Sequence, residues 1–174
     1  MESGFLTQIK INSTLGNELV TVQEAKDYIR VDTSSDDNLI SAMISQSRIW
    51  CENYISKDIV SKNRTYYLRD VNDRFELPFA PISSISEVTV DGSVVADYEV
   101  YGLDDSIIEL STFPSKEVKV TYVTSGIGGS LIKNAMMQLV STYYDNRSDF
   151  KEQKFEMIPT DVRAILTSYK SLFI

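Results

Sequence analysis

The chain has 174 residues, a formal net charge of −8 at pH 7 and an apolar share of 43%. This length predicts one domain, with room for an inserted subdomain. A chain of this size can bury a hydrophobic core large enough to be stable without disulfides or bound metal. The sequence contains no histidine, which excludes Ser-His-Asp and Cys-His catalytic groups and removes the commonest zinc ligand. The net acidity disfavours general DNA binding, because affinity for the phosphate backbone comes largely from Lys and Arg.

The N-terminal residues carry weak signals. They lack a basic region followed by a long apolar run, so no signal peptide is predicted. No stretch of the sequence approaches the roughly 20 apolar residues of a membrane helix. Residues 1–20 are expected to form an extended arm or an edge strand.

The lone Cys51 excludes an internal disulfide, and its place in a helical apolar stripe predicts a small core residue rather than a reactive thiol.

Residues 21–58 are predicted to form two helices. Thr21 and Glu24 make a capping box, in which each side chain accepts from the other residue's backbone N–H. A polar break then leads to Asp36 and Asp37, which open a longer helix. These two acids are either a helix cap or a metal or acid–base pair, and we favour the cap because caps prefer such residues. Spacings of three and four place the following residues on one face of the longer helix: Ile40, Met43, Ile44, Ser47, Trp50, Cys51, Tyr54 and Ile55.

Residues 59–124 change to a period of two and are rich in β-branched and aromatic side chains, which predicts strands. The expected strands are residues 64–68, 74–77, 85–90, 98–101, 107–110 and 117–123. Asp91-Gly92 is a strong signal for a tight hairpin turn after the third strand. Together these segments predict one small antiparallel sheet of about five or six strands.

Two more helices are expected towards the C-terminus. The glycine-rich residues 125–130 lack both the Lys of a P-loop and a βαβ setting, so a strand-to-helix connection is favoured over a phosphate cradle. A third helix is predicted over residues 130–147, and Pro159-Thr160-Asp161 starts a fourth. The apolar face of the third helix comprises Leu131 or Ile132, Ala135, Met136, Leu139, Val140, Tyr143 and Tyr144.

The predicted fold class is therefore α+β, in the order α-α-β-α-α. We expect a four-helix core with an antiparallel β-sheet subdomain inserted between the second and third helices. The expected boundaries are 1–20 for an N-terminal extended arm, 21–58 and 125–174 for the helical core, and 59–124 for the inserted subdomain. The sequence predicts no catalytic residue, no metal ligand and no cofactor.

Apolar side chains in polar or terminal segments predict contacts with another chain, because such residues need burial. Six residues fit this description: Phe150, Phe155, Met157, Leu172, Phe173 and Ile174.

Three separated stretches form a recognisable pattern. LVTVQEAKDYIRVD, residues 19–32, leads into a long helix that ends in ENYISKDI. LPFAPI, residues 77–82, leads into ISEVTVDG. Tyr122 and Gly126 lead into a helix that ends in YYDNR, and IPTDVRAILTSYK follows. In this order and spacing the stretches resemble the tailed-phage head–tail connector or adaptor proteins, also called head-completion proteins, and the related gene-transfer-agent adaptors.

This resemblance implies a structural virion protein without enzymatic activity or cofactor. It implies a protein of the host cytoplasm before assembly, which then forms a homo-oligomeric ring, commonly a dodecamer, beneath the portal protein in the neck of the virion. The ring would extend the DNA channel and provide the attachment surface for the next neck, stopper or tail protein. DNA would pass through without specific binding, and no membrane is involved.

Three alternatives remain open. The first is another structural role in the phage neck, that of a tail-completion or terminator protein. The second is a small enzyme that uses carboxylates such as Glu76, Asp91 or Asp104. The third is a nucleic-acid-binding packaging factor, which the net acidity disfavours.

Overall fold

The structure is a computed structural model, which describes residues 7–146 and 158–170. The chain divides into two compact units: a strand unit of Met1–Gly16 with Val60–Ile127, and a helical unit of Asn17–Ile59 with Gly128–Ile174. The described residues confirm the coarse prediction of a mixed α and β fold with four helices and antiparallel sheets. The finer arrangement, a helical core with an inserted sheet, and its domain boundaries stay predictions.

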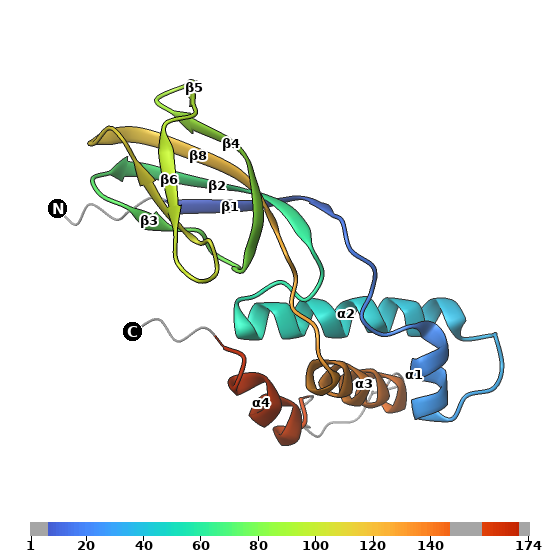
Figure 1. Cartoon of the computed structure of the whole chain (residues 1–174). Coiled ribbons are helices and arrows are strands. Elements are labelled where there is room, and N and C mark those ends of the chain that lie inside the picture. Colours follow the sequence, from blue (N-terminus) through green and yellow to red (C-terminus); the bar gives the residue numbers. More distant parts are fainter. Residues whose placement is uncertain (1–6, 147–157, 171–174) are drawn as a thin grey trace. The chain divides into compact units, whose positions relative to one another are not determined.

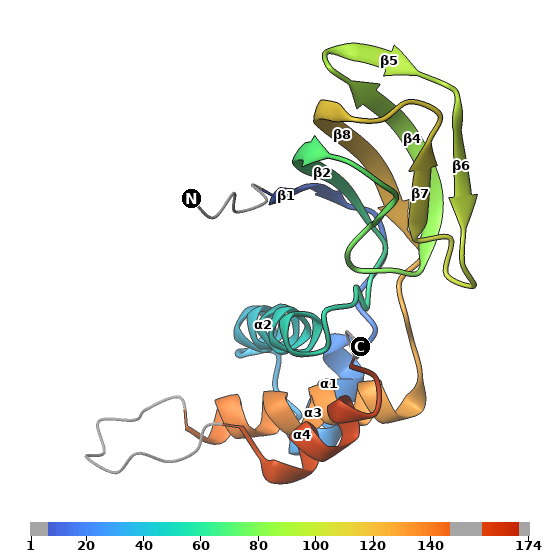
Figure 2. The same cartoon turned by 90° about the vertical axis from the view of Figure 1, so that its left-hand side faces the viewer.

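The strand unit contains two antiparallel sheets, so the prediction of a single sheet was wrong. The larger sheet has the order β1 (Thr7–Thr14), β2 (Lys62–Val71), β8 (Ser115–Thr124), β4 (Ile82–Val90) and β5 (Ser93–Val95), as Figure 1 shows. The smaller sheet has the order β3 (Phe75–Glu76), β7 (Ile107–Leu110) and β6 (Tyr98–Tyr101), and Figure 2 shows β6 and β7 beside β4. Periodicity predicts the two faces of each strand, but it does not say which strands pair.

The apolar faces of the two sheets enclose one core. Tyr122 of β8 and Ile108 of β7 are fully buried in the same hydrophobic cluster. The Tyr122 hydroxyl donates to the Pro78 carbonyl oxygen at 2.8 Å, so the polar tip of this buried ring has a partner. The other faces of the two sheets therefore point to opposite sides of the strand unit.

Two local features of this unit bear on the sequence predictions. β1, which comes from the residues expected as an arm, pairs antiparallel with β2 and is exposed along its whole length. Asp91 and Gly92 form the predicted turn between β4 and β5, both with positive φ, as a type I′ hairpin requires. The Asp91 carboxylate also accepts from the backbone N–H groups of Lys116 and Glu117 at 2.9 and 2.8 Å.

The helical unit consists of α1 (Val22–Ile29), α2 (Asp37–Ile55), α3 (Ser130–Asp145) and α4 (Thr160–Thr167). On α3 the structure buries Ile132 and leaves Leu131 52% exposed, which decides between the two candidates for its apolar face. Val162 and Leu166 of α4 are fully buried as well. Within residues 7–146 and 158–170, no helix combines the length and the apolar character needed to cross a membrane.

The predicted capping box at the start of α1 is present. The Thr21 hydroxyl accepts from the Glu24 N–H at 3.2 Å, and the Glu24 carboxylate accepts from the Thr21 N–H at 3.0 Å. Glu24 also receives a hydrogen bond from Lys133 of α3 at 2.5 Å, which links the cap to a second helix. This hydrogen bond, followed by those from Thr21, lowers the pKa of Glu24 to about 2.

We predict that Leu139→Ala lowers the free energy of unfolding by about 2–5 kcal/mol, because it leaves a cavity at a fully buried position of α3. Leu131→Ala is the matched control on the same helix, and it should change the unfolding free energy by less than about 0.5 kcal/mol. Urea unfolding followed by circular dichroism measures both. Equal effects of the two substitutions would contradict the burial assigned to α3.

We also predict a pH dependence from Glu24. Its pKa is depressed in the folded chain, so its contribution to stability is complete above the ordinary pKa of 4.5 and is lost as the pH falls towards 2. Glu24→Gln should therefore destabilise the protein at pH 6, and this difference should shrink at pH 3. Carboxyl NMR titration should place the pKa of Glu24 well below 4.5, and Lys133→Met should raise it. An ordinary pKa in the wild-type protein would refute the link between the cap and Lys133.

Candidate interaction surfaces

The six residues predicted to contact other chains lie outside the described residues. Phe150, Phe155 and Met157 belong to residues 147–157, and Leu172, Phe173 and Ile174 to residues 171–174. Their assignment as contacts stays a prediction. The candidate surfaces below come from the described parts of each unit.

The acidic pair at the start of α2 also joins helices. Asp36 occupies the predicted N-cap position, but its side chain makes no capping hydrogen bond and instead accepts from the Tyr144 hydroxyl of α3 at 2.5 Å. Asp37, in the first turn of α2, forms an ion pair with Lys26 of α1 at 2.8 Å. The predicted cap is therefore confirmed in position, while each carboxylate binds a donor from another helix.

Two buried charged residues of α2, Arg48 and Glu52, form an ion-pair network that was not predicted from the sequence. The Arg48 guanidinium donates to Glu18 at 2.8 Å and to Glu52 at 2.9 Å, and the other Glu52 oxygen accepts from the Ile59 N–H at 3.0 Å. Burial alone would lower the pKa of Arg48, but the two carboxylates outweigh it and raise the pKa. Arg48 and Glu52 are only 8% and 3% exposed. Their spacing of four residues on a helix is the signal that would have suggested a pair.

The described residues do not assemble a catalytic or metal centre. Glu76 lies on β3, Asp91 in the β4–β5 turn, and Asp104 between β6 and β7, so the three carboxylates of the enzyme alternative stand on separate elements. No group of three or more Cys, Asp or Glu side chains in the described ranges could hold a metal ion. Cys51 is fully buried, and that burial raises the pKa of its thiol to about 12, in line with the predicted core role.

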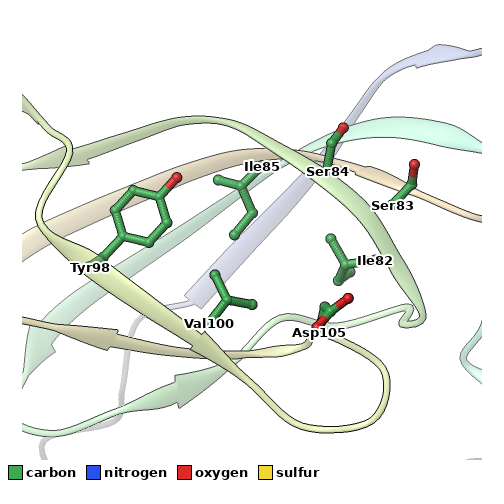
Figure 3. Close-up of a pocket in the computed structure, with 7 residues that line it drawn as sticks. All are labelled: Ile82, Ser83, Ser84, Ile85, Tyr98, Val100 and Asp105. Carbon is green, nitrogen blue, oxygen red and sulfur yellow. The ribbon is translucent and has the colours of Figure 1, made fainter.

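A hollow of about 300 Å³ opens between β4 and β6 in the strand unit. Figure 3 shows Ile82 and Ile85 of β4 facing Val100 and Tyr98 of β6, with Asp105 at the rim. β5 pairs only with the C-terminal part of β4, so the part of β4 beside the hollow lacks a strand on that side. Ser83 and Ser84 complete the lining, which is mixed in polarity and contains an acidic but no cationic residue, so it does not suit a phosphate group.

The outer face of the three-stranded sheet carries three carboxylates, Glu76, Glu99 and Glu109. Between residues 75 and 115 the sequence has no Lys or Arg and eight acidic residues: Glu76, Glu87, Asp91, Asp97, Glu99, Asp104, Asp105 and Glu109. In the register of β6 and β7, exposed Glu99 stands directly opposite exposed Glu109. Tyr101 donates a hydrogen bond to Glu99, and that bond, together with burial and the charges of Glu99 and Glu109, raises the pKa of the tyrosine.

The outer face of the five-stranded sheet has a different character. A hollow of about 440 Å³ is lined by Gln8, Ile9, Lys10, Asn12, Thr65, Tyr67 and Lys119, with two lysines and no carboxylate. Side-chain hydrogen bonds cross the strands here, from Asn12 to Thr65 at 2.9 Å and between Thr65 and Thr121 at 3.1 Å. Two carboxylates border this hollow on the same face: Glu117 pairs with Lys119 at 2.7 Å, and exposed Glu87 of β4 stands opposite Thr121, so the face carries both charges.

Comparison with known proteins gives a family and a fold. The family model described as head completion protein matches residues 18–172. A chain in the neck of an empty gene transfer agent (GTA) particle, computed with C6 symmetry, is similar with a TM-score of 0.76 and 17% identity, over 96% of this chain and 97% of that chain. A chain in the virion of a native GTA particle has a TM-score of 0.75 and 16% identity, over 95% and 96%.

A third solved structure, the neck of a native GTA particle computed with C12 symmetry, has a TM-score of 0.66 and 17% identity over 96% of this chain and 97% of that chain. The chain matches no curated protein sequence. At these identities the solved structures establish a shared fold that extends over almost the whole of both chains.

Proposed function

The chain belongs to the head completion protein family, and from this we propose that it is a structural protein of the neck of a phage or gene-transfer-agent virion. The observation that carries the proposal is the family match, which extends over residues 18–172. The similarity to chains of GTA necks over 96% of the chain supports the same location. The family description names completion of the head and no catalysis.

Within the neck the protein forms a homo-oligomeric ring. Two similar neck structures were computed with C6 and C12 symmetry, and a ring of twelve copies is compatible with both. Such a ring needs head-to-tail contacts, in which two different surfaces of each copy meet and the rotation closes. The two outer faces of the strand unit, one with Glu99 and Glu109 and one with both lysine and glutamate, are two different surfaces of this kind.

The ring docks beneath the portal protein, extends the DNA channel, and presents an attachment surface for the next neck, stopper or tail protein. The net charge of −8 supports a channel role, because DNA must slide past the ring and attraction to phosphate would hinder it. The docking contacts are assigned to Phe150, Phe155 and Met157 and to the C-terminal Leu172, Phe173 and Ile174. Their apolar character in polar or terminal segments supports this assignment.

We predict that the purified protein binds the portal protein encoded with it and forms rings on it, visible by negative-stain electron microscopy. Deletion of residues 172–174 should abolish portal binding, because it removes three apolar contact residues. The length-matched variant Leu172→Ser/Phe173→Ser/Ile174→Ser should behave like the deletion, and both should unfold at the wild-type urea midpoint.

Two results would count against parts of this proposal. Binding to the end of the tail tube, without binding to the portal, would favour the alternative of a tail-completion or terminator protein. Normal portal binding by the truncated protein would remove the C-terminal residues from the contact and leave the neck location standing.

A further inference from the structure

A second hollow of the strand unit, about 240 Å³ in volume, lies where β1 begins. Its apolar lining comes from Leu68 and Val71 of β2 and Phe75 of β3, and Thr7 borders it at the start of β1. Leu68 and Val71 are buried members of the core between the two sheets, and Phe75 packs against that core. An apolar group in this hollow would therefore extend the core.

The polar residues of the lining do not select a charged ligand. Arg69 and Arg74 contribute cations and Asp73 contributes a carboxylate, so both charges are present. The Asp73 carboxylate accepts from the Arg74 N–H at 2.7 Å, and Arg69 lies 3.9 Å from the Asp70 carboxylate. What suits this hollow is decided by its apolar lining and by the position of the chain beside it.

The strand register shows which side of β1 faces the hollow. Thr7 stands opposite buried Leu68, and it shares a side-chain hydrogen bond with Tyr66, which packs against the same core. Side chains alternate along a strand, so a continuation of β1 places Phe5 on the side of Thr7 and Leu6 on the outer side. Two strand residues span roughly 7 Å, which brings Phe5 to the hollow that Thr7 borders.

The backbone of β2 leaves this place to an incoming side chain. The register of β1 and β2, continued by two residues, sets Phe5 opposite Asp70. Asp70 has a positive φ of 54°, and its side chain is 74% exposed. Leu68 and Val71, on either side of Asp70, are both buried. The apolar neighbours of Asp70, rather than Asp70 itself, therefore line the position that Phe5 would reach.

We propose that the Phe5 ring fills this hollow of its own chain, so that β1 continues past Thr7 and residues 1–6 belong to the strand unit. An aromatic ring in a terminal segment needs burial, and this hollow lies two residues away from it. A group tethered at the rim has a high effective concentration there, which favours it over a second copy or a small apolar molecule. The N-terminal segment is then anchored on the strand unit and is not a free arm for partners in the neck.

Neighbouring positions on opposite sides of the strand provide a matched pair of variants. Phe5→Ser removes the buried ring, so it should lower the thermal unfolding midpoint of the full-length protein by about 5 °C or more. Leu6→Ser makes a similar change on the outer side and should shift the midpoint by less than about 2 °C. Hydrogen exchange of the β1 amides should become about tenfold faster in Phe5→Ser and stay at the wild-type rate in Leu6→Ser.

NMR of the isolated wild-type chain gives a reading that needs no substitution, even where Phe5→Ser fails to fold. Nuclear Overhauser effects should join the Phe5 ring to the methyl groups of Leu68 and Val71 within one labelled chain. Their absence would overturn the proposal, and so would equal midpoints for Phe5→Ser and Leu6→Ser. Effects seen only between differently labelled copies would also overturn it, because the occupant would then be a second copy. The portal takes no part in this test, so its outcome is separate from that of the proposed function.

Discussion

The buried Arg48 guanidinium is the interaction on which the helical unit depends most. It binds Glu18 just after the chain enters this unit, and through Glu52 it is linked to the backbone of Ile59 just before the chain leaves. A buried ion without its partners costs several kcal/mol, so these contacts must be kept together for the unit to fold. The long helix α2 thereby holds both ends of Asn17–Ile59, the first of the two segments that make up the helical unit.

The remaining polar contacts of this unit link α2 to α1 and α3, and α1 to α3. Asp37 reaches Lys26 of α1, Asp36 receives the Tyr144 hydroxyl of α3, and Glu24 receives Lys133 of α3. The charged groups at the starts of α1 and α2 are used between helices, while the apolar side chains of α2, α3 and α4 fill the interior. Such polar links between helices add specific geometry to the apolar packing.

Much of this fold follows from local sequence signals, and the remainder depends on pairing between distant segments. The capping box, the Asp91-Gly92 turn and the bounds of β6 and β7 were predicted because each rests on neighbouring residues. The division into two sheets was not, since strand periodicity is the same in either arrangement. Arg48 and Glu52 were missed because charged residues are rarely buried, and Asp36 was assigned to a cap because its Tyr144 donor lies 108 positions away. The opposed pair Glu99 and Glu109 follows from the register of β6 and β7, which no short motif reveals.

The central claim is that this member of the head completion protein family forms a ring beneath the portal protein in the neck of a virion. A cryo-electron microscopy reconstruction of the protein mixed with its portal tests this claim most directly. The expected result is a closed ring of this chain seated on the portal. A portal without such a ring, or the protein seated instead on the end of the tail tube, would contradict it.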